Sequence, residues 1–260
     1  MLLAIDVGNT NTAIGIFQGE TLKHNWSIST QSYKTTDEIG MLLLSMFRYA
    51  NEDIEQVNDV IICSVVPHVM RTLTSAVKKY IHRNPIVVGP GVKTGINIKY
   101  EDPREVGADK IVNAVSAIKL YGAPVIVVDF GTATTFCAVN ASKDYLGGVI
   151  CPGIKISAEA LFAKASKLPR VEIIEPVGVI GKNTVTSIQS GLFFGYLGQV
   201  EYIVKKMKNE MKEDNIMVVA TGGFAEALKP HCRCVDEVNG LLTLTGLKEI
   251  YLLNKNNRNA

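Results

Sequence analysis

The chain has 260 residues, of which 47% are hydrophobic and 20% are charged, as expected for a globular protein with a substantial core. Its formal net charge of +2 provides no strong field for nucleic acid or an anionic membrane surface. No run approaches the roughly 18 consecutive apolar residues of a membrane span, and the N-terminal MLLAIDVG lacks the basic segment of a signal peptide. We therefore expect a cytoplasmic protein that binds neither nucleic acid nor membrane.

The first predicted elements are a β-hairpin over residues 2–17 and a strand over 22–30. Thr35 and Glu38 have the spacing of a capping box, which predicts that a helix starts there. The apolar run 59–67 predicts a strand buried on both faces.

A helix over about 68–82 and a short strand over 85–90 are expected next. Residues 91–105 form a polar connection with no periodicity, and loops of this length are often functional. This loop leads into a helix predicted over 105–122.

The second half repeats this order of elements. It is expected to contain, in chain order, a hairpin (125–140), a strand (145–150), a helix (about 155–167), a strand (171–174), a long helix (184–211), a strand (216–223), a short helix, a strand (231–236) and a final helix (241–254). Alternating strands and helices predict the α/β class, and the initial hairpins predict mixed sheets. We expect two domains, residues 1–122 and 123–260.

A motif that occurs twice is the main functional signal. Residues 2–17 and 125–140 each combine an apolar run, Asp-x-Gly, a cluster of Thr or Asn and a second apolar run. Asp129 follows Asp6 by 123 residues, and the same offset aligns Thr12 with Thr135. The repeat suggests two related halves that hold a metal nucleotide.

The loop of the first copy is suited to phosphate. Gly8 has no side chain to block the approach of phosphate to backbone N–H groups. Asp6, at the strand end, can hold Mg²⁺ directly or through water. An Asn-rich turn without a ligand is the alternative for this segment.

The second copy offers Asp129, Gly131 and Thr132 in the same setting. A third glycine segment, Thr221-Gly222-Gly223, lies between a predicted strand and a helix, where backbone can approach a nucleotide. That signal is weak alone, because many α/β crossings carry glycine for packing.

Gly107 to Lys110 open the helix after the irregular loop. Free N–H groups at a helix start favour an anionic ligand, and Asp109 is a candidate general base for a substrate hydroxyl. Asp109 could instead be an ordinary first-turn acid that complements the helix dipole.

Two other patterns resemble known binding sites, a Walker A loop and a zinc site, but do not match them. The segment 178–184 has two residues between its glycines, whereas a Walker A loop has four. Cys232 and Cys234 follow His231, but no second cluster supplies the other ligands of a closed zinc site.

Taken together, these motifs resemble the type III pantothenate kinases, members of the superfamily of acetate and sugar kinases, heat-shock ATPases and actin. The resemblance extends from end to end and rests on the segments 6–12, Tyr100 with 107–110, 129–134, Gly147-Gly148 with Pro152-Gly153, and 221–223. It implies duplicated ribonuclease-H-like (actin-like ATPase) domains, a homodimer, and ATP-dependent phosphorylation of pantothenate in coenzyme A biosynthesis.

The resemblance also implies roles for particular residues. Asp109 would accept the proton of the pantothenate hydroxyl, and Asp129 would hold a monovalent cation (K⁺ or NH₄⁺). Thr184 would reach the substrate across the dimer interface. The residues implied to contact ATP are Asp6, Val7, Gly8, Asn9, Thr10, Asn11, Thr12, Ala13 and Thr132, and those implied to contact pantothenate are Tyr100, Gly107, Ala108, Asp109, Lys110 and Thr184.

One position departs from the family pattern, since Lys110 stands where the family usually has Arg. Lysine keeps the charge but loses the bidentate geometry toward carboxylate. Two alternative functions are a kinase of the same superfamily acting on another hydroxy acid or sugar, and a non-catalytic regulator.

Overall fold

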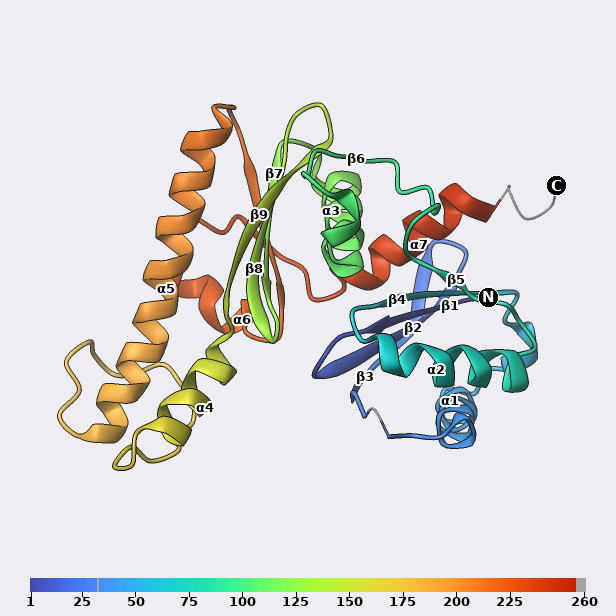
Figure 1. Ribbon diagram of the computed structural model, residues 1–260, viewed down its shortest axis with the longest axis horizontal. Helices are drawn as coiled ribbons and strands as arrows, with labels where there is room; N and C mark the ends of the chain where they lie inside the picture. Colours follow the sequence, from blue (N-terminus) through green and yellow to red (C-terminus); the bar gives the residue numbers. More distant parts are fainter. Residues whose placement is uncertain (32, 256–260) are drawn as a thin grey trace. The chain divides into compact units, whose positions relative to one another are not determined.

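The computed structural model describes residues 1–31 and 33–255, which form two compact units (Figure 1). The first unit comprises residues 1–96, 101–116 and 241 onward, and the second comprises 97–100 and 117–240. The division therefore differs from the expected boundary at residue 122. The reason is that the C-terminal helix α7 (Leu242–Lys255) packs against strands of the first unit.

The first unit is built on a five-stranded mixed sheet in the order β3-β2-β1-β4-β5. The hairpin strands β1 and β2 are antiparallel, whereas β1 and β4 are parallel. The strands are β1 (Leu2–Val7), β2 (Asn11–Gln18), β3 (Thr21–Ser29), β4 (Asp59–Ser64) and β5 (Ile86–Val87).

Helices cover both faces of this sheet. Helices α1 (Thr36–Tyr49) and α2 (Pro67–Tyr80) pack on one face, and α7 packs on the other with the first part of α3 (Ala108–Tyr121). Leu3, Ile5 and Val7 contact the α1/α2 core, while Leu2 and Ala4 contact the α3/α7 core. Because side chains alternate along a strand, Asp6 lies on the α3/α7 face.

Local sequence signals account for the ends of these elements. The capping box of Thr35 and Glu38 is confirmed, with each side chain bonded to the other residue's backbone N–H. Pro67 is the first residue of α2, a position where the missing N–H of proline costs no helical hydrogen bond. The strand expected over 59–67 therefore ends earlier, at Ser64.

The second unit is built on a six-stranded mixed sheet in the order β11-β10-β7-β8-β9-β6. Its central hairpin, β7 with β8, is antiparallel, and β7 is parallel to β10. The strands are β6 (Asn97–Ile98), β7 (Val125–Phe130), β8 (Ala133–Val139), β9 (Asp144–Pro152), β10 (Met217–Gly222) and β11 (Glu237–Val238).

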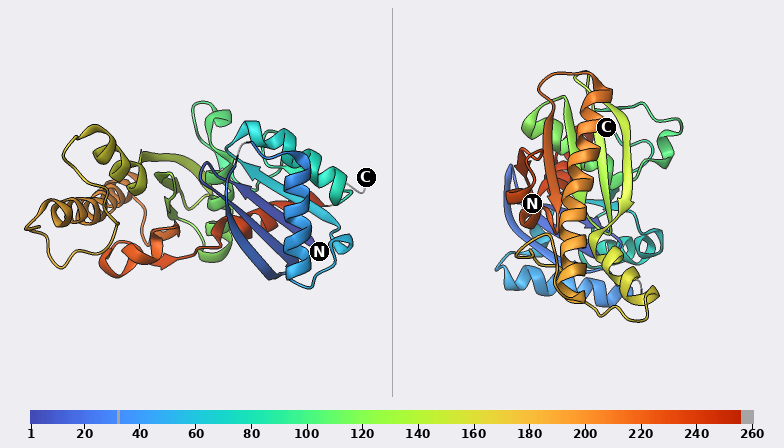
Figure 2. Two further views of the ribbon diagram at one scale, coloured as in Figure 1. Left: turned by 90° about the horizontal axis from the view of Figure 1, so that it is seen from below. Right: turned by 90° about the vertical axis from the view of Figure 1, so that its left-hand side faces the viewer.

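The long helix α5 (Thr184–Met211) and the short helix α6 (Ala225–Leu228) pack on one face of this sheet. The right-hand view of Figure 2 shows α5 lying lengthwise over the strands. Phe193, Leu197 and Val200 of α5 are buried against Val128 and Phe130 of β7. Helix α4 (Ile154–Lys164) follows β9 and packs against α5.

Three expected elements of this unit differ in the structure. The loop 91–105 contains the short strand β6, which pairs with β9. Residues 171–174 form no strand, since Val171 and Ile173 pack as irregular chain against the core of α4 and α5. The strand expected over 231–236 is a turn, and the strand β11 begins after it.

The two mixed sheets flanked by helices confirm the predicted α/β class. The remaining regular segments are short 3₁₀ turns at Ile54–Gln56, Pro103–Glu105 and Lys229–His231. In the described part of the chain, no helix is both long and apolar enough to span a bilayer.

Candidate functional site

Asp6 and Cys63 lie directly opposite one another on the parallel strands β1 and β4. Cys63 is fully buried in the α3/α7 core, and its thiol donates a hydrogen bond to the Asp6 carboxylate. Burial, reinforced by the negative charges of Asp6 and Asp109, raises the pKa of Cys63 well above its usual value. The thiol therefore stays protonated and remains a donor at neutral pH.

Asp109 lies in the first turn of α3 and acts electrostatically on the same thiol. Its Oδ1 atom is buried and has no hydrogen-bond partner among the described residues. A buried acceptor without a donor is costly, so such an atom fits a site whose donor arrives with a ligand. Asp6, Cys63 and Asp109 thus form one cluster in the first unit.

Gly107 provides space beside Asp109 and Lys110. A Cβ atom at residue 107 would lie 2.5 Å from Asp109 Oδ1 and 3.4 Å from Lys110 Nζ. The first distance is a collision, so a side chain here would displace the Asp109 carboxylate. The helix begins at the next residue, Ala108, and the Gly107 carbonyl accepts from the N–H groups of Lys110 and Ile111.

The loop of the first hairpin is held by Thr30 of the following segment. The Thr30 hydroxyl donates to the Gly8 carbonyl at 2.7 Å, and the Thr30 N–H donates to the Thr10 carbonyl at 2.8 Å. Thr12 shares a hydrogen bond of 2.9 Å with the Thr30 hydroxyl. The Thr12 side chain therefore braces the loop, while Asn9, Thr10 and Asn11 are exposed.

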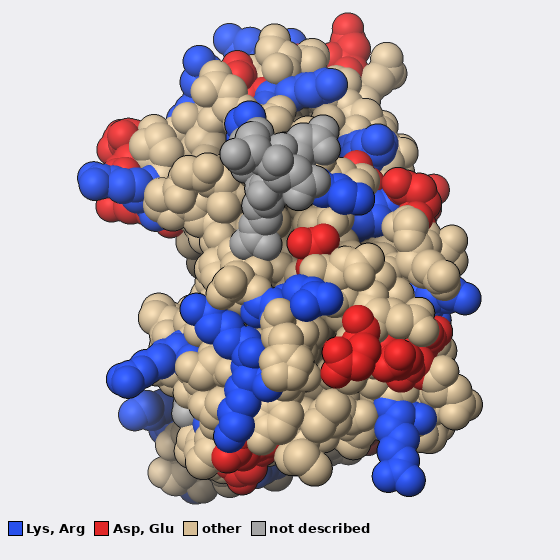
Figure 3. All heavy atoms as spheres, turned by 90° about the vertical axis from the view of Figure 1, so that its right-hand side faces the viewer, with Lys and Arg blue, Asp and Glu red and all other residues tan. Residues whose placement is uncertain are grey.

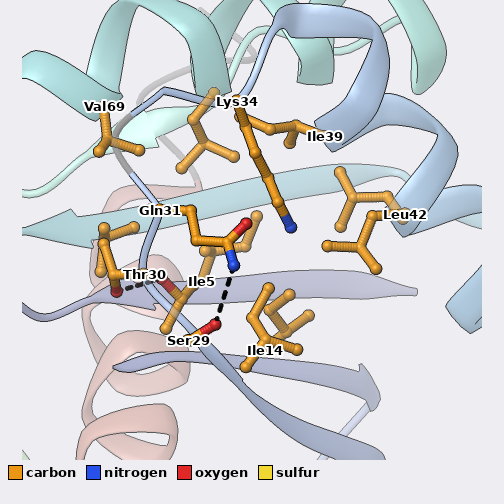
Figure 4. Close-up of a pocket in the computed structure, with 14 residues that line it drawn as sticks. Ile5, Ile14, Ser29, Thr30, Gln31, Lys34, Ile39, Leu42 and Val69 are labelled. Atoms are coloured by element: carbon orange, nitrogen blue, oxygen red, sulfur yellow. Dashed lines mark hydrogen bonds between the residues drawn. The ribbon is translucent and has the colours of Figure 1, made fainter. Parts of the chain in front are cut away.

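A small apolar cavity of about 40 Å³ lies behind this loop, between the first sheet and helices α1 and α2 (Figure 4). Ile5 and Ile14 line it from the sheet and Leu42 from helix α1, and Gln31 and Lys34 also line it. Asp6 is on the opposite face of the sheet, so this cavity is separate from the carboxylate cluster.

The second hairpin places Asp129 opposite Thr221 on the parallel strand β10. Gly222 follows with φ of +90°, a conformation that favours glycine. A Cβ atom at residue 222 would lie 2.7 Å from Asp129 Oδ1 and equally close to the Phe130 backbone. Gly222 is therefore required for the close packing of β10 on the Asp129 carboxylate.

The loop at Thr132 is supported from behind by the end of β9. The Gly153 N–H donates to the Thr132 carbonyl at 3.1 Å, and a Cβ atom at residue 153 would lie 2.2 Å from the same oxygen. Thr132 itself is exposed. The glycine thus fixes the path of the loop while the Thr132 side chain remains accessible.

The two copies of the motif differ by one residue in loop length. Val7 pairs with Thr12 in the first hairpin, whereas Phe130 pairs with Thr134 in the second. The alignment of Thr12 with Thr135 was therefore wrong, and Thr12 corresponds to Thr134. Both threonines are buried, in agreement with the corrected alignment.

The register also identifies Cys63 as the counterpart of Thr221. Each occupies the position opposite the motif aspartate on the neighbouring parallel strand. Sequence reasoning missed Cys63, to which it gave no functional role. One feature of the sequence could have indicated it. Cys63 is a possible hydrogen-bond donor near the end of a buried strand, as Thr221 is in the second half of the chain.

The remaining predicted residues lie elsewhere in the units. Tyr100 follows β6 in the second unit, and its ring would lie 3.6 Å from a Cβ atom at Gly147. Thr184 is exposed and is the first residue of α5, whose N-terminus is capped by Asn183. Ala13, half-buried on β2, pairs with Asp6.

The described side chains suit a metal ion that takes most of its ligands from a bound nucleotide and water. Among residues 1–31 and 33–255, no group of three or more His, Cys, Asp and Glu side chains could hold a metal ion. Mg²⁺ in nucleotide sites is usually bound by one or two carboxylates together with phosphate and water. Asp6 offers a carboxylate of that kind, and Asp129 offers a carboxylate to a second cation.

Surface charge in the region of the first unit is mixed. Figure 3 shows one face, on which groups of Lys and Arg side chains lie between groups of Asp and Glu side chains. This distribution agrees with the small net charge of +2.

Comparison with known proteins identifies the family. The family model described as type III pantothenate kinase matches residues 2–206. The chain belongs to this family. Membership makes it a kinase, a phosphotransferase of the kind that uses ATP, and connects it with coenzyme A biosynthesis.

Solved structures support the fold of this family member. A protein from Campylobacter jejuni, provisionally described as a Baf family transcriptional activator, has a TM-score of 0.61 at 19% identity, covering 98% of this chain and 99% of that one. A protein from Sinorhizobium meliloti, provisionally described as a 2-dehydro-3-deoxygalactonokinase, has a TM-score of 0.60 at 10% identity, with 97% and 99% covered. The ROK hexokinase from Thermus thermophilus has a TM-score of 0.51 at 13% identity, with 98% and 99% covered. These likenesses confirm the fold, with its two mixed sheets flanked by helices.

Proposed function

We propose that this protein transfers the γ-phosphoryl group of ATP to the hydroxyl of pantothenate, giving 4'-phosphopantothenate. The observation that carries the proposal is the unpartnered, buried Oδ1 of Asp109 at the start of α3, within the region that the family model matches. A substrate hydroxyl is the donor that this atom lacks.

Phosphoryl transfer requires mainly positioning and charge stabilisation from the protein. Asp109 accepts the hydrogen bond of the attacking hydroxyl and takes its proton as the bond to phosphorus forms. Lys110, which shares the space over Gly107 with Asp109, pairs with the pantothenate carboxylate. Tyr100 and Ala108 complete the contacts with pantothenate.

The two hairpin loops bind the nucleotide in this proposal. Backbone N–H groups of residues 6–13 and the Thr132 hydroxyl contact the phosphates. Asp6 would hold Mg²⁺ through water and Asp129 a monovalent cation, K⁺ or NH₄⁺, and these ions supply neutralisation of phosphate charge when bound. Cys63 keeps the Asp6 carboxylate oriented through its hydrogen bond.

The proposal includes a cytoplasmic homodimer in which Thr184 contacts the substrate held by the partner subunit. Thr184 is exposed at the start of α5, which leaves its hydroxyl accessible to another molecule. Mixing Asp109→Asn protein with Thr184→Val protein tests this arrangement. Activity regained above that of either variant supports a shared site, whereas activity that never exceeds the better variant contradicts it; Thr184→Ser, which keeps the hydroxyl, is the control.

The substrate is tested by ADP release from ATP in the presence of Mg²⁺, K⁺ and a panel of acceptors. The panel contains pantothenate, a hexose, an N-acetylated hexosamine and a sugar acid. Pantothenate alone is expected to support turnover. Preference for a sugar would make the protein a different kinase of the same fold. The absence of ADP release with every acceptor in the panel would support a non-catalytic function.

A further inference from the structure

The turn after α6 carries a pair of thiols that the kinase chemistry does not use. The Val235 N–H donates to the Cys232 carbonyl at 3.4 Å and closes a turn in which Cys232 is the first residue and Cys234 the third. The two Sγ atoms lie 3.3 Å apart and share a hydrogen bond. Of the described cysteines, these two are therefore already in contact as a dithiol.

The two thiols differ in exposure and in proton affinity. Cys232 is 3% exposed, whereas Cys234 is half-buried and follows the exposed Arg233. The hydrogen bond from Cys234 lowers the pKa of Cys232 to about 7, and the same bond raises the pKa of Cys234. The pair therefore loses a first proton near neutral pH and keeps the second, which the two sulfur atoms share. Of the two sulfur atoms, that of Cys234 belongs to the more exposed residue and meets a solvent-borne oxidant first.

The turn is fixed at its far end, which holds the two sulfur atoms in place. The Asp236 N–H donates to the Val218 carbonyl at 2.9 Å, and the Val218 N–H donates to an Asp236 carboxylate oxygen at 2.8 Å. Lys229 Nζ donates to the carbonyls of Val235 and Asp236. Forming an S–S bond of about 2.05 Å requires the sulfur atoms to close by only roughly 1.2 Å, which side-chain rotation can supply.

We propose that Cys232 and Cys234 are a modification site, at which hydrogen peroxide converts the dithiol into a reversible intramolecular disulfide. In the first step, Cys234 Sγ attacks a peroxide oxygen and passes its proton to Cys232; the O–O bond breaks and the departing hydroxide takes a proton from solvent. In the second step, Cys232 loses its proton and attacks the sulfenic sulfur of Cys234, displacing hydroxide as water. The dithiol loses two hydrogen atoms and two electrons, and one peroxide becomes two waters.

The surroundings of Cys232 and Cys234 fit a disulfide better than a metal site. His231 is engaged by Glu175, with its Nε2 atom 3.2 Å from the carboxylate. Among the described residues, the two thiols are not joined by a third ligand within a possible metal cluster. A closed zinc site requires four ligands.

The test treats the reduced full-length protein with hydrogen peroxide and maps its tryptic peptides by mass spectrometry. Trypsin cleaves after Arg233, so the peptides with Cys232 and Cys234 should separate when reduced and stay linked, lighter by two hydrogen atoms, after oxidation. Dithiothreitol should separate them again. Cys232→Ser removes both the base and the second thiol, so it should form no linked peptides and should react with peroxide more slowly, leaving on Cys234 a sulfenic acid that dimedone traps.

Cys151 provides the matched control. It is also half-exposed but lies on β9, outside the turn that holds the dithiol, so Cys151→Ser should form the linked peptides as readily as the unmodified protein. Separate, unmodified peptides under conditions that oxidise Cys151 would overturn the proposal. Disulfides between molecules, or sulfinic acid at Cys234 in the unmodified protein, would overturn it as well. None of these outcomes depends on which substrate the kinase phosphorylates.

Discussion

The thiol of Cys63 donates a hydrogen bond to the carboxylate of Asp6 from the neighbouring parallel strand. The two residues are 57 positions apart in the sequence and meet through strand register alone. Thr221 and Asp129 repeat this placement in the second unit. Each carboxylate of the duplicated motif thus has a residue capable of donating a hydrogen bond on the next strand.

Replacing Cys63 tests whether its hydrogen bond supports catalysis. Cys63→Ala should lower kcat/KM for ATP about tenfold or more, since a hydrogen bond to a charged group contributes about 1.5–3 kcal/mol. Cys63→Ser keeps a donor and should stay within about threefold of the unmodified enzyme, a difference of only roughly 0.7 kcal/mol. Steady-state kinetics at varied ATP and Mg²⁺ measure both effects.

Cys137→Ala is the control for the loss of a buried thiol, since Cys137 is also buried and also hydrogen-bonded, accepting from the Tyr145 hydroxyl at 3.4 Å, but lies in the second unit. It should lower stability without the same loss of kcat/KM. Equal kinetic losses in Cys63→Ala and Cys63→Ser would show that volume, and not hydrogen bonding, explains the effect.

Asp109→Asn removes the proposed proton acceptor while keeping the size of the side chain. We expect kcat to fall by about 10² or more, with ATP binding nearly unchanged. Single-turnover kinetics and calorimetric titration with a non-hydrolysable ATP analogue separate the two quantities. Glu105→Gln, an exposed acid just before the same helix, should keep normal turnover. Near-normal turnover of Asp109→Asn would remove Asp109 from the mechanism.

Lys110→Arg restores the residue usual in the family. Arginine can bind a carboxylate through two parallel hydrogen bonds, so the KM for pantothenate should fall while kcat changes little. Initial rates at varied pantothenate give both constants. An unchanged or higher KM would contradict the assignment of Lys110 to the substrate carboxylate.

Gly222→Ala tests the packing around Asp129. The added Cβ would lie 2.7 Å from Asp129 Oδ1, and φ of +90° is unfavourable for alanine, so both strain and displacement of the carboxylate are expected. The K⁺ concentration for half-maximal activity should rise about tenfold, equivalent to roughly 1.4 kcal/mol. Titration of activity with K⁺ measures this shift.

Gly223→Ala is the neighbouring control, because a Cβ atom there would meet nothing within 4 Å. It should leave the K⁺ dependence unchanged. The same shift in both variants would indicate a general disturbance of β10, and no shift in Gly222→Ala would separate Asp129 from the cation.

Local signals in the sequence were sufficient for most elements. The capping box at Thr35 predicted the start of α1, and the apolar runs around Asp6 and Asp129 predicted two hairpins that the structure contains. The segment 231–236 was misassigned because its Cys and Val residues favour strands, whereas the hydrogen bonds there close a turn. Tertiary contacts decided that segment.

The site could be predicted only where its residues are close in sequence. Gly107 to Lys110 form a continuous segment whose glycine and acid are readable from the chain. The contact of Cys63 with Asp6 could not be predicted from the sequence, because the register of two parallel strands is set by the whole sheet. The same holds for the difference of one residue between the two hairpin loops.

The most direct test of the central claim is the identification of the reaction product. Purified protein with ATP, Mg²⁺ and pantothenate should yield ADP and phosphorylated pantothenate in equal amounts, faster with K⁺ than with Na⁺. Mass spectrometry of the acceptor and a coupled assay for ADP measure the two products together. ADP formation without phosphorylated pantothenate, or phosphorylation of a sugar in its place, would contradict the proposed function.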